Sequence, residues 1–276
     1  MDQVASFAVG SVQVGGPSLV VIGGPCLAES DEICLQVGST LQSLCQEFGL
    51  GYIFKASFDK ANRSSLTQRG DGIEVGLERI HRTAAQLGVP CTTDIHLPEQ
   101  AAQVAPHVDL LQIPAFLCRQ TDLLLAAAET GRPVNVKKGQ FLAPWDCKNI
   151  VEKLTSFGAA GAMLTERGTS FGYNTLVVDM PGLETMRALG VPVCFDATHS
   201  AQRPGGQGTS TGGVRESIPA MARAAVAVGV DAVFLECHPD PERALSDAAT
   251  QWPLDRAREL IQQISQVDQA RRALPH

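Results

Sequence analysis

The chain has few of the features that mark membrane-spanning, secreted or nucleic-acid-binding proteins. No apolar run approaches the roughly 18 residues that a membrane span needs. The first residues, MDQVASFAVG, contain no basic segment followed by an apolar stretch, so we expect no secretory signal and a cytoplasmic protein. A net charge of −7 disfavours nucleic acid and anionic membranes as partners.

Cysteine motifs are also absent. The eight cysteines include no C-x-x-C pair, and their spacing suggests no disulfide framework in a chain of 276 residues. We interpret most of them as small buried apolar residues in a reducing compartment, with Cys26 as an exception. Aromatic residues make up only 5% of the chain, whereas 44% is hydrophobic, so the core is expected to consist mainly of Val, Ile, Leu and Ala.

What the chain does contain is a repeated pattern of short apolar stretches that end in polar residues. Eight stretches read as buried strands: 20–26, 52–55, 90–94, 110–112, 134–137, 163–167, 193–199 and 233–236. Segments with helical spacing of apolar residues alternate with them: 31–48, 72–88, 98–106, 119–130, 146–158, 181–189, 214–229 and 253–267. Eight strand–helix units predict an α/β fold, a (β/α)8 TIM barrel, with its chemistry at the carboxyl ends of the strands.

Other segments complete the predicted architecture. The length is slightly above the ~250 residues typical of such a barrel, which predicts one domain over 1–276. Residues 7–16 alternate apolar and small residues and predict a short N-terminal β-hairpin that plugs the bottom of the barrel. The polar connection 56–71 and the Gly- and Ser-rich connection 201–213 are long, and we expect the second to be a mobile active-site loop.

Positive charge is scarce and concentrated. There are only six lysines, and four of them follow the second and fifth predicted strands: Lys55, Lys60, Lys137 and Lys138. Arg63, Arg119 and Arg167 occupy equivalent places, so we expect a small anionic ligand such as a phosphate ester. Strand alternation places Lys138 on the face opposite to Lys137, as an ordinary surface cation.

Two clusters of donors indicate two anionic groups. Lys137 and Arg167, on neighbouring strands, could clamp a phosphate or carboxylate, with Lys55 or Lys60 completing the pocket. The second cluster is Asn62, Arg63 and Ser64, together with Arg119. A strand-end lysine that forms a Schiff base with a carbonyl substrate remains an alternative.

A mixed set of metal-ligating residues also falls at strand ends. Cys26, His199, Glu236 and Asp247 follow the first, seventh and eighth strands, and the first and eighth are neighbours in a closed barrel. One sulfur, one imidazole and two carboxylates can bind Zn²⁺, Fe²⁺ or Mn²⁺. From spacing alone, His199 could equally be a general acid/base or a packed core histidine.

Long motifs across the chain resemble the 3-deoxy-D-manno-octulosonate 8-phosphate (KDO 8-phosphate) synthase family. The resemblance runs from about residue 19 to 255 and rests on GGPCLAES (23–30), FKASFDKANRSS (54–65), TDIHLPEQA (93–101), LQIPAFLCRQTDLL (111–124), NVKKGQFLAPW (135–145), LTERGTSFGYNTLVVDM (164–180), FDATHSAQRPGG (195–206) and LECHPDPERALSDA (235–248). It implies condensation of phosphoenolpyruvate with arabinose 5-phosphate and water, in KDO and lipopolysaccharide biosynthesis.

The resemblance also implies roles for individual residues. Lys60, Lys137 and Arg167 would hold phosphoenolpyruvate, helped by the neighbouring Ser57, Gln112, Ala115 and Lys55. Asn62 would contact the sugar chain, and Arg63 and Ser64 the sugar phosphate. Arg119 would come from a neighbouring subunit of a homotetramer whose sites are shared.

The family has metal-dependent and metal-independent forms, and a cysteine after Gly-Pro marks the first. Cys26, together with Ser246-Asp247, therefore implies a divalent metal bound by Cys26, His199, Glu236 and Asp247. Asp94 and His96 are expected to relay protons.

Three other functions are compatible with a barrel that binds sugar phosphates. A 3-deoxy-heptulosonate 7-phosphate synthase would use a shorter sugar phosphate, but the run Lys60-Ala-Asn-Arg-Ser-Ser65 resembles the eight-carbon enzyme. A Schiff-base aldolase would trap its substrate on a strand-end lysine. A barrel that only binds sugar phosphates, without catalysis, is the third.

Overall fold

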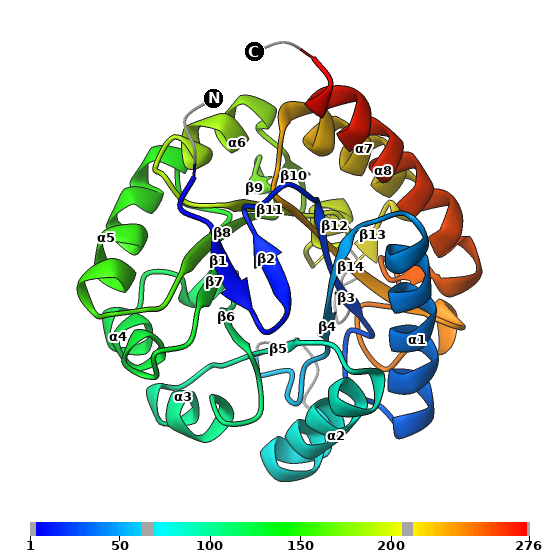
Figure 1. Cartoon of the computed structure of the whole chain (residues 1–276), viewed down its shortest axis with the longest axis horizontal. Coiled ribbons are helices and arrows are strands. Elements are labelled where there is room, and N and C mark those ends of the chain that lie inside the picture. Colours follow the sequence, from blue (N-terminus) through cyan, green and yellow to red (C-terminus); the bar gives the residue numbers. More distant parts are fainter. Residues whose placement is uncertain (1–3, 62–68, 206–211, 275–276) are drawn as a thin grey trace.

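A closed barrel of parallel strands forms the centre of the molecule. The computed structural model describes residues 4–61, 69–205 and 212–274. The wall consists of β3 (Val20–Gly24), β4 (Gly51–Lys55), β5 (Cys91–Asp94), β6 (Leu110–Ile113), β7 (Val134–Lys137), β8 (Ala162–Glu166), β11 (Val193–Asp196) and β14 (Ala232–His238). Because β14 pairs in parallel with both β3 and β11, the sheet closes, and the predicted (β/α)8 fold is confirmed (Figure 1).

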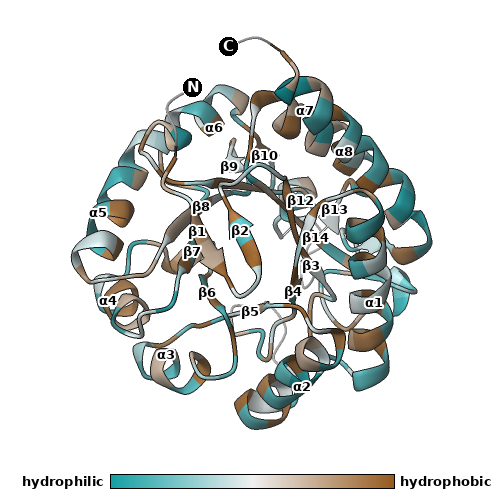
Figure 2. Cartoon of the chain, viewed as in Figure 1, coloured by the Kyte–Doolittle hydropathy of each residue, from teal (hydrophilic) through white to brown (hydrophobic). Residues whose placement is uncertain are grey.

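Helices surround the barrel as the apolar periodicity predicts. They are α1 (Asp31–Glu47), α2 (Gly72–Leu87), α3 (Pro98–Val104), α4 (Thr121–Glu129), α5 (Lys148–Ser156), α6 (Met180–Arg187), α7 (Ile218–Val228) and α8 (Ala257–Arg272). The Ser30 hydroxyl caps α1 by accepting from the Ile33 N–H at 3.1 Å, and α2 ends at Gly88, whose φ of 66° suits glycine. Polar residues cover the outward faces of this ring, and apolar ones line the strands (Figure 2).

The N-terminal hairpin seals the barrel at the amino ends of its strands. β1 (Phe7–Val9) pairs antiparallel with β2 (Val12–Val14), and the pair crosses the centre of the ring (Figure 1). Phe7, Val9 and Val14 are buried in one cluster with interior side chains of the wall, such as Ile22. This confirms the predicted hairpin and its position as a plug.

Shorter elements modify the loops at the carboxyl ends. β9 (Thr169–Ser170) and β10 (Leu176–Val177) form a hairpin after β8, β12 (Gln202–Arg203) pairs with β13 (Gly212–Gly213), and β15 (Trp252–Pro253) extends β14. The 3₁₀ turns are η1 (Ala115–Leu117), η2 (Pro144–Cys147), η3 (His199–Ala201), η4 (Arg215–Ser217), η5 (Pro241–Arg243) and η6 (Leu254–Arg256). The predicted mobile loop 201–213 thus has a paired base, while 206–211 lies outside the described residues.

The predicted strand 193–199 is too long, for a local reason. β11 ends at Asp196, whose Oδ1 accepts from the Thr198 hydroxyl at 3.2 Å and from the His199 N–H at 2.9 Å. Such a side chain-to-backbone bond turns the chain.

No helix in the described part of the chain has the length and apolarity to cross a membrane.

Replacing Phe7 with alanine tests the plug. The ring is 8% exposed, and its atoms would lie within 2.3–2.7 Å of a Cβ placed on Gly161, so it fills the space that this glycine leaves. We expect Phe7→Ala to lower the free energy of unfolding by about 3 kcal/mol. Gln13→Ala, on the exposed face of the hairpin, should change it by less than about 0.5 kcal/mol. Urea denaturation measures both, and equal effects would contradict the plug.

Candidate active site

Polar side chains from several strands point into the barrel at its carboxyl end. Lys55 ends β4, Asp94 ends β5, Lys137 ends β7, and Glu236 lies in β14. All four residues are at most 9% exposed. Strand alternation directs them inward, so the closed barrel brings together charges that are far apart in the sequence.

The first cluster joins two lysines to two carboxylates. Lys55 Nζ lies 2.7 Å from Glu236 Oε1 and donates to Ser57 Oγ at 3.0 Å. Lys60 Nζ donates to the same hydroxyl at 3.0 Å, and Ser57 in turn donates to Asp94 Oδ2 at 2.5 Å. Burial opposes ionisation of Asp94, but Lys55 and Lys60 outweigh it and hold the pKa of that carboxyl well below its usual range. The cluster is therefore fully charged near neutral pH.

A second cluster surrounds Lys137. Its ammonium lies 2.6 Å from Asp196 Oδ2 and 3.6 Å from the centroid of the Phe234 ring. The same Asp196 oxygen is 2.8 Å from His199 Nδ1. Burial would raise the pKa of Asp196, but His199 and Lys137 lower it well below the usual value. Asp196 was not predicted from the sequence. It lies in the motif 195–206, and strand alternation places it two residues after the inward-facing Cys194 of β11.

Arg167 is a buried cation of this mouth. The residue is 7% exposed, and its Nη2 donates to Gln202 Oε1 at 2.7 Å. Its Nη1 is buried without a hydrogen-bond partner among the described residues. Because a buried unsatisfied donor is destabilising, this atom marks a position where an anion would be stabilised.

Three of the four predicted metal ligands form a compact group. Ligand atoms of Cys26, Glu236 and Asp247 all lie within 4.8 Å of one another. The fourth is close by, with His199 Nε2 at 3.6 Å from Glu236 Oε2 and 3.8 Å from Asp247 Oδ2. The sequence-predicted set therefore converges in space.

The chemistry of this group suits a divalent cation. Burial, and then the charge of Glu236, raises the pKa of the Cys26 thiol, which donates to Asp247 Oδ2 at 3.2 Å. A cation at this position would compensate both carboxylates and favour the thiolate. His199 Nδ1 already lies against Asp196, which leaves Nε2 directed at the group, an arrangement typical of metal-bound histidine.

Backbone geometry holds the Asp247 carboxylate in place. Asp247 has a φ of 48°, in the left-handed region that non-glycine residues seldom adopt. Its carbonyl accepts from the Thr250 and Gln251 N–H groups at 2.9 and 3.0 Å. Gln251 also accepts from the Cys26 N–H at 3.2 Å through Oε1. Gln251, which the sequence reasoning missed, thus ties two predicted ligands together across the barrel mouth.

A chain of polar side chains runs beneath the charged groups. Gln112 Nε2 donates to Asp94 Oδ1 at 2.6 Å, and Asn135 Nδ2 donates to Gln112 Oε1 at 3.0 Å. Thr165 Oγ1 then donates to Asn135 Oδ1 at 2.7 Å. The chain fixes the orientation of the Gln112 amide and explains how polar groups are satisfied inside the wall.

The structure gives less information on the other predicted residues. Asn62, Arg63 and Ser64 lie outside the described residues, and Arg119 is exposed just beyond η1. Ala115 is buried in η1. His96 packs edge-on to Phe58 with ring centroids 6.2 Å apart, and burial lowers its pKa, which favours the neutral imidazole.

The prediction of Lys138 as a surface cation is wrong. Alternation correctly places it on the outer face of β7, but the residue is 0% exposed and its Nζ lies 3.3 Å from Glu166 Oε2. The loops that follow β7 and β8 cover it, and a single sequence does not indicate such a cover.

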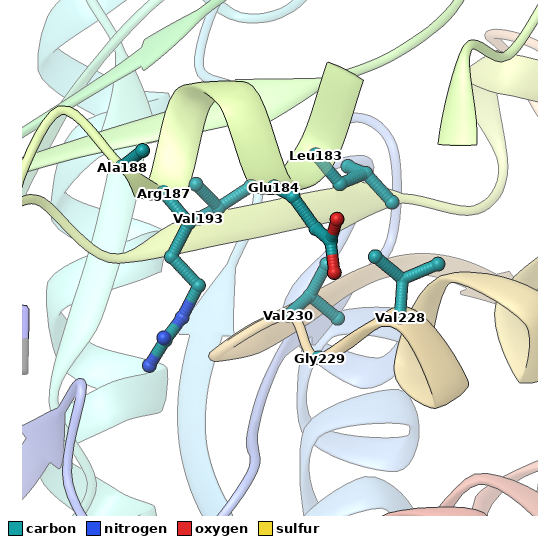
Figure 3. Close-up of a pocket in the computed structure, with 8 residues that line it drawn as sticks. All are labelled: Leu183, Glu184, Arg187, Ala188, Val193, Val228, Gly229 and Val230. Atoms are coloured by element: carbon teal, nitrogen blue, oxygen red, sulfur yellow. The ribbon is translucent and has the colours of Figure 1, made fainter. Parts of the chain in front are cut away.

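One pocket lies at the other end of the barrel. It sits between α6 and α7, with Leu183, Val193, Val228 and Val230 around it and Arg187 at its edge (Figure 3). Val193 begins β11, so the pocket belongs to the amino ends of the strands and not to the charged mouth.

Comparison with known proteins places the chain in a family. The sequence pattern of the DAHP synthetase I family matches residues 4–273. A protein of Cyanothece sp. named 2-dehydro-3-deoxyphosphooctonate aldolase is 58% identical over 90% of this chain and 92% of its own length. Proteins of the same name from Nitratidesulfovibrio vulgaris (56%; 89% of this chain, 90% of theirs) and Brucella ovis (53%; 98% of both) are also similar. The chain therefore belongs to the DAHP synthetase I family, among its 2-dehydro-3-deoxyphosphooctonate aldolases.

Proposed function

We propose that this protein condenses phosphoenolpyruvate with D-arabinose 5-phosphate and water, releasing phosphate and forming KDO 8-phosphate for lipopolysaccharide biosynthesis. 2-Dehydro-3-deoxyphosphooctonate is a synonym of that product, and relatives named for it are 51–58% identical to this chain. The observation that carries the proposal is the buried cationic mouth of an acidic protein, where Arg167 Nη1 has no partner among the described residues.

Phosphoenolpyruvate carries a phosphate and a carboxylate, which need several fixed donors. Arg167 offers a planar fork, and Lys60 and Lys137 offer point charges from other strands or loops. Ser57 and Gln112 add neutral donors nearby, and Ala115 lines the same end of the barrel. Since most of these groups are buried, and the charged ones are held by hydrogen bonds, they would bind the substrate without large rearrangement.

The residues also suit the bond changes. The enol carbon of phosphoenolpyruvate would attack the sugar aldehyde while water adds to the neighbouring carbon, and the tetrahedral intermediate would lose phosphate by carbon–oxygen cleavage. Asp94 stays ionised beside the lysines, whereas burial favours neutral His96, so the pair could relay a proton. Burial of the mouth excludes competing water.

We further propose a divalent metal at Cys26, His199, Glu236 and Asp247. When bound, it would polarise the sugar aldehyde as a Lewis acid. Asp196 orients the His199 ring through Nδ1, and Gln251 holds the Cys26 backbone. The donor set accepts Zn²⁺, Fe²⁺ and Mn²⁺.

The Schiff-base alternative is disfavoured by the charges around the lysines. A Schiff-base lysine needs a depressed pKa so that its amine is neutral. Burial alone would lower the pKa of Lys55, but the 2.7 Å contact with Glu236 outweighs it and raises the pKa. The pKa of Lys60 is raised as well, against its burial.

We propose a homotetramer in which Arg119 reaches the site of a neighbouring subunit. Arg119 is exposed next to Phe116, which is itself 55% exposed. Further large apolar side chains are exposed on the loops after β7 and β8, including Phe141, Trp145 and Phe171. Exposed apolar side chains at this density are typical of a protein–protein interface.

The reaction is tested by phosphate release with each sugar phosphate. We expect release only when phosphoenolpyruvate and an aldose phosphate are both present, with arabinose 5-phosphate preferred over erythrose 4-phosphate. Borohydride added during turnover should leave every lysine unlabelled, as mass spectrometry would report. Faster turnover of erythrose 4-phosphate would point to the heptulosonate synthase, and a labelled lysine to the aldolase.

The metal is tested by elemental analysis alongside activity. Chelation should abolish turnover, and Mn²⁺ or Zn²⁺ should restore it. Cys26→Ser should lower the bound metal at least about tenfold, because it replaces the thiolate ligand. Cys45→Ala, a buried cysteine of α1, should keep the wild-type metal content. Full activity in protein shown to be free of metal would refute this site.

Oligomerisation is tested by Phe116→Asp. A charge at this exposed apolar position should dissociate the tetramer in light scattering and lower kcat/KM for arabinose 5-phosphate about tenfold or more, because Arg119 would no longer reach its partner. Val75→Asp is the matched control, since Val75 is 52% exposed and belongs to α2, not to these loops. An intact tetramer with Phe116→Asp would oppose the proposed interface.

A further inference from the structure

Behind the Lys137 and Arg167 side chains, the barrel wall contains a second pair of charges. Lys137 and Arg167 are each adjacent in sequence to a residue of opposite orientation, Lys138 and Glu166. In the register of β7 with β8, Lys137 lies opposite Thr165. Lys138, just after β7, therefore comes beside Glu166, the last residue of β8. Their side chains form an ion pair, Nζ to Oε2 at 3.3 Å, on the outer face of the wall.

This pair is completely enclosed. Lys138 is 0% exposed and Glu166 is 1% exposed. Burying two charges is unfavourable in itself, and an apolar pair of similar size would often give equal or greater stability. The presence of a buried ion pair here is therefore weak evidence that the pair stabilises the fold. A role in fixing the positions of neighbouring residues fits the observation better.

The contacts of the pair reach both loops of the mouth. Lys138 Nζ donates to Leu142 O at 3.1 Å in the loop after β7, and to Thr169 Oγ1 at 3.1 Å in β9 after β8. Glu166 Oε1 accepts from the Gly168 N–H at 2.5 Å. The ammonium and the carboxylate thus hold the chain that follows Lys137 and the chain that follows Arg167.

We propose that the Lys138–Glu166 ion pair is a positioning element for the anion clamp formed by Lys137 and Arg167. This inference rests on the proposed function, because it assigns phosphoenolpyruvate to that clamp. The pair touches no substrate. It sets the peptide segments 137–138 and 166–167, so that Lys137 stays against Asp196 and Arg167 keeps its Nη1, which has no partner among the described residues, in position for the anion. Displacement of either cation by a fraction of an ångström would weaken phosphoenolpyruvate binding and leave the sugar phosphate contacts unchanged.

The first test is Glu166→Gln, which removes the charge and keeps the shape. The amide oxygen can still accept from Gly168, so the fold should persist. We expect KM for phosphoenolpyruvate to rise about tenfold, with kcat and KM for arabinose 5-phosphate within about twofold of wild type. A folded Glu166→Gln protein with wild-type KM values would overturn the proposal.

The second test separates positioning from stability. In Lys138→Met with Glu166→Met, an apolar pair replaces the ions, and we expect an unfolding temperature at or above that of wild type. The proposal requires KM for phosphoenolpyruvate to remain about tenfold raised in this stable protein. If stability and KM return to wild type together, the pair is merely structural and the proposal fails.

A control pair lies at the other end of the barrel. Arg187 Nη2 is 3.2 Å from Asp231 Oδ1, and Asp231 also accepts from the Val193 N–H. Arg187→Met should lower the unfolding temperature without changing either KM.

Calorimetric titration with phosphoenolpyruvate should reproduce the KM effects as binding constants. Wild-type protein that neither binds phosphoenolpyruvate nor releases phosphate would refute the proposed function itself, whereas wild-type activity with unchanged variants would refute only the positioning role.

Discussion

The mouth of the barrel depends on buried charges that remain ionised because each lies against an opposite charge. Lys55 lies 2.7 Å from Glu236, and Lys137 lies 2.6 Å from Asp196. Removing one partner of such a pair would leave an uncompensated buried charge, which is typically destabilising by about 3–5 kcal/mol. The closed sheet makes this arrangement possible, because β14 lies beside β3 and β11 and brings residues from both ends of the chain to one mouth.

This balance of charge would let the site bind anions while its own buried charges remain paired. Asp196 forms an ion pair with Lys137, and Gln202 accepts from Arg167 Nη2, while Arg167 Nη1 has no partner in the part of the chain that the structure describes. Under the proposed function, a substrate phosphate would meet a donor that is already oriented, and its binding would satisfy a buried polar atom. The Cys26 thiol and the Glu236 and Asp247 carboxylates form a separate group, whose donor atoms suit a cation.

The strands and the principal charged residues could be predicted from the sequence because buried parallel strands are apolar runs with polar ends. The hydrogen-bond and ion-pair partners that lie far apart in the sequence could not be predicted. Gln251 contacts Cys26 across 225 positions, and Asp196 contacts Lys137 across 59. Alternation gave the face of Lys138, but its burial depends on Leu142 and other residues of loops whose path a single sequence does not specify.

The most direct measurement is a crystal structure with phosphoenolpyruvate and Mn²⁺ bound, with anomalous data to locate the metal. We expect phosphate oxygens within hydrogen-bond distance of Arg167 Nη1, and one anomalous peak shared by Cys26, His199, Glu236 and Asp247. A phosphate bound elsewhere on the barrel, or manganese bound away from Cys26, would contradict this expectation.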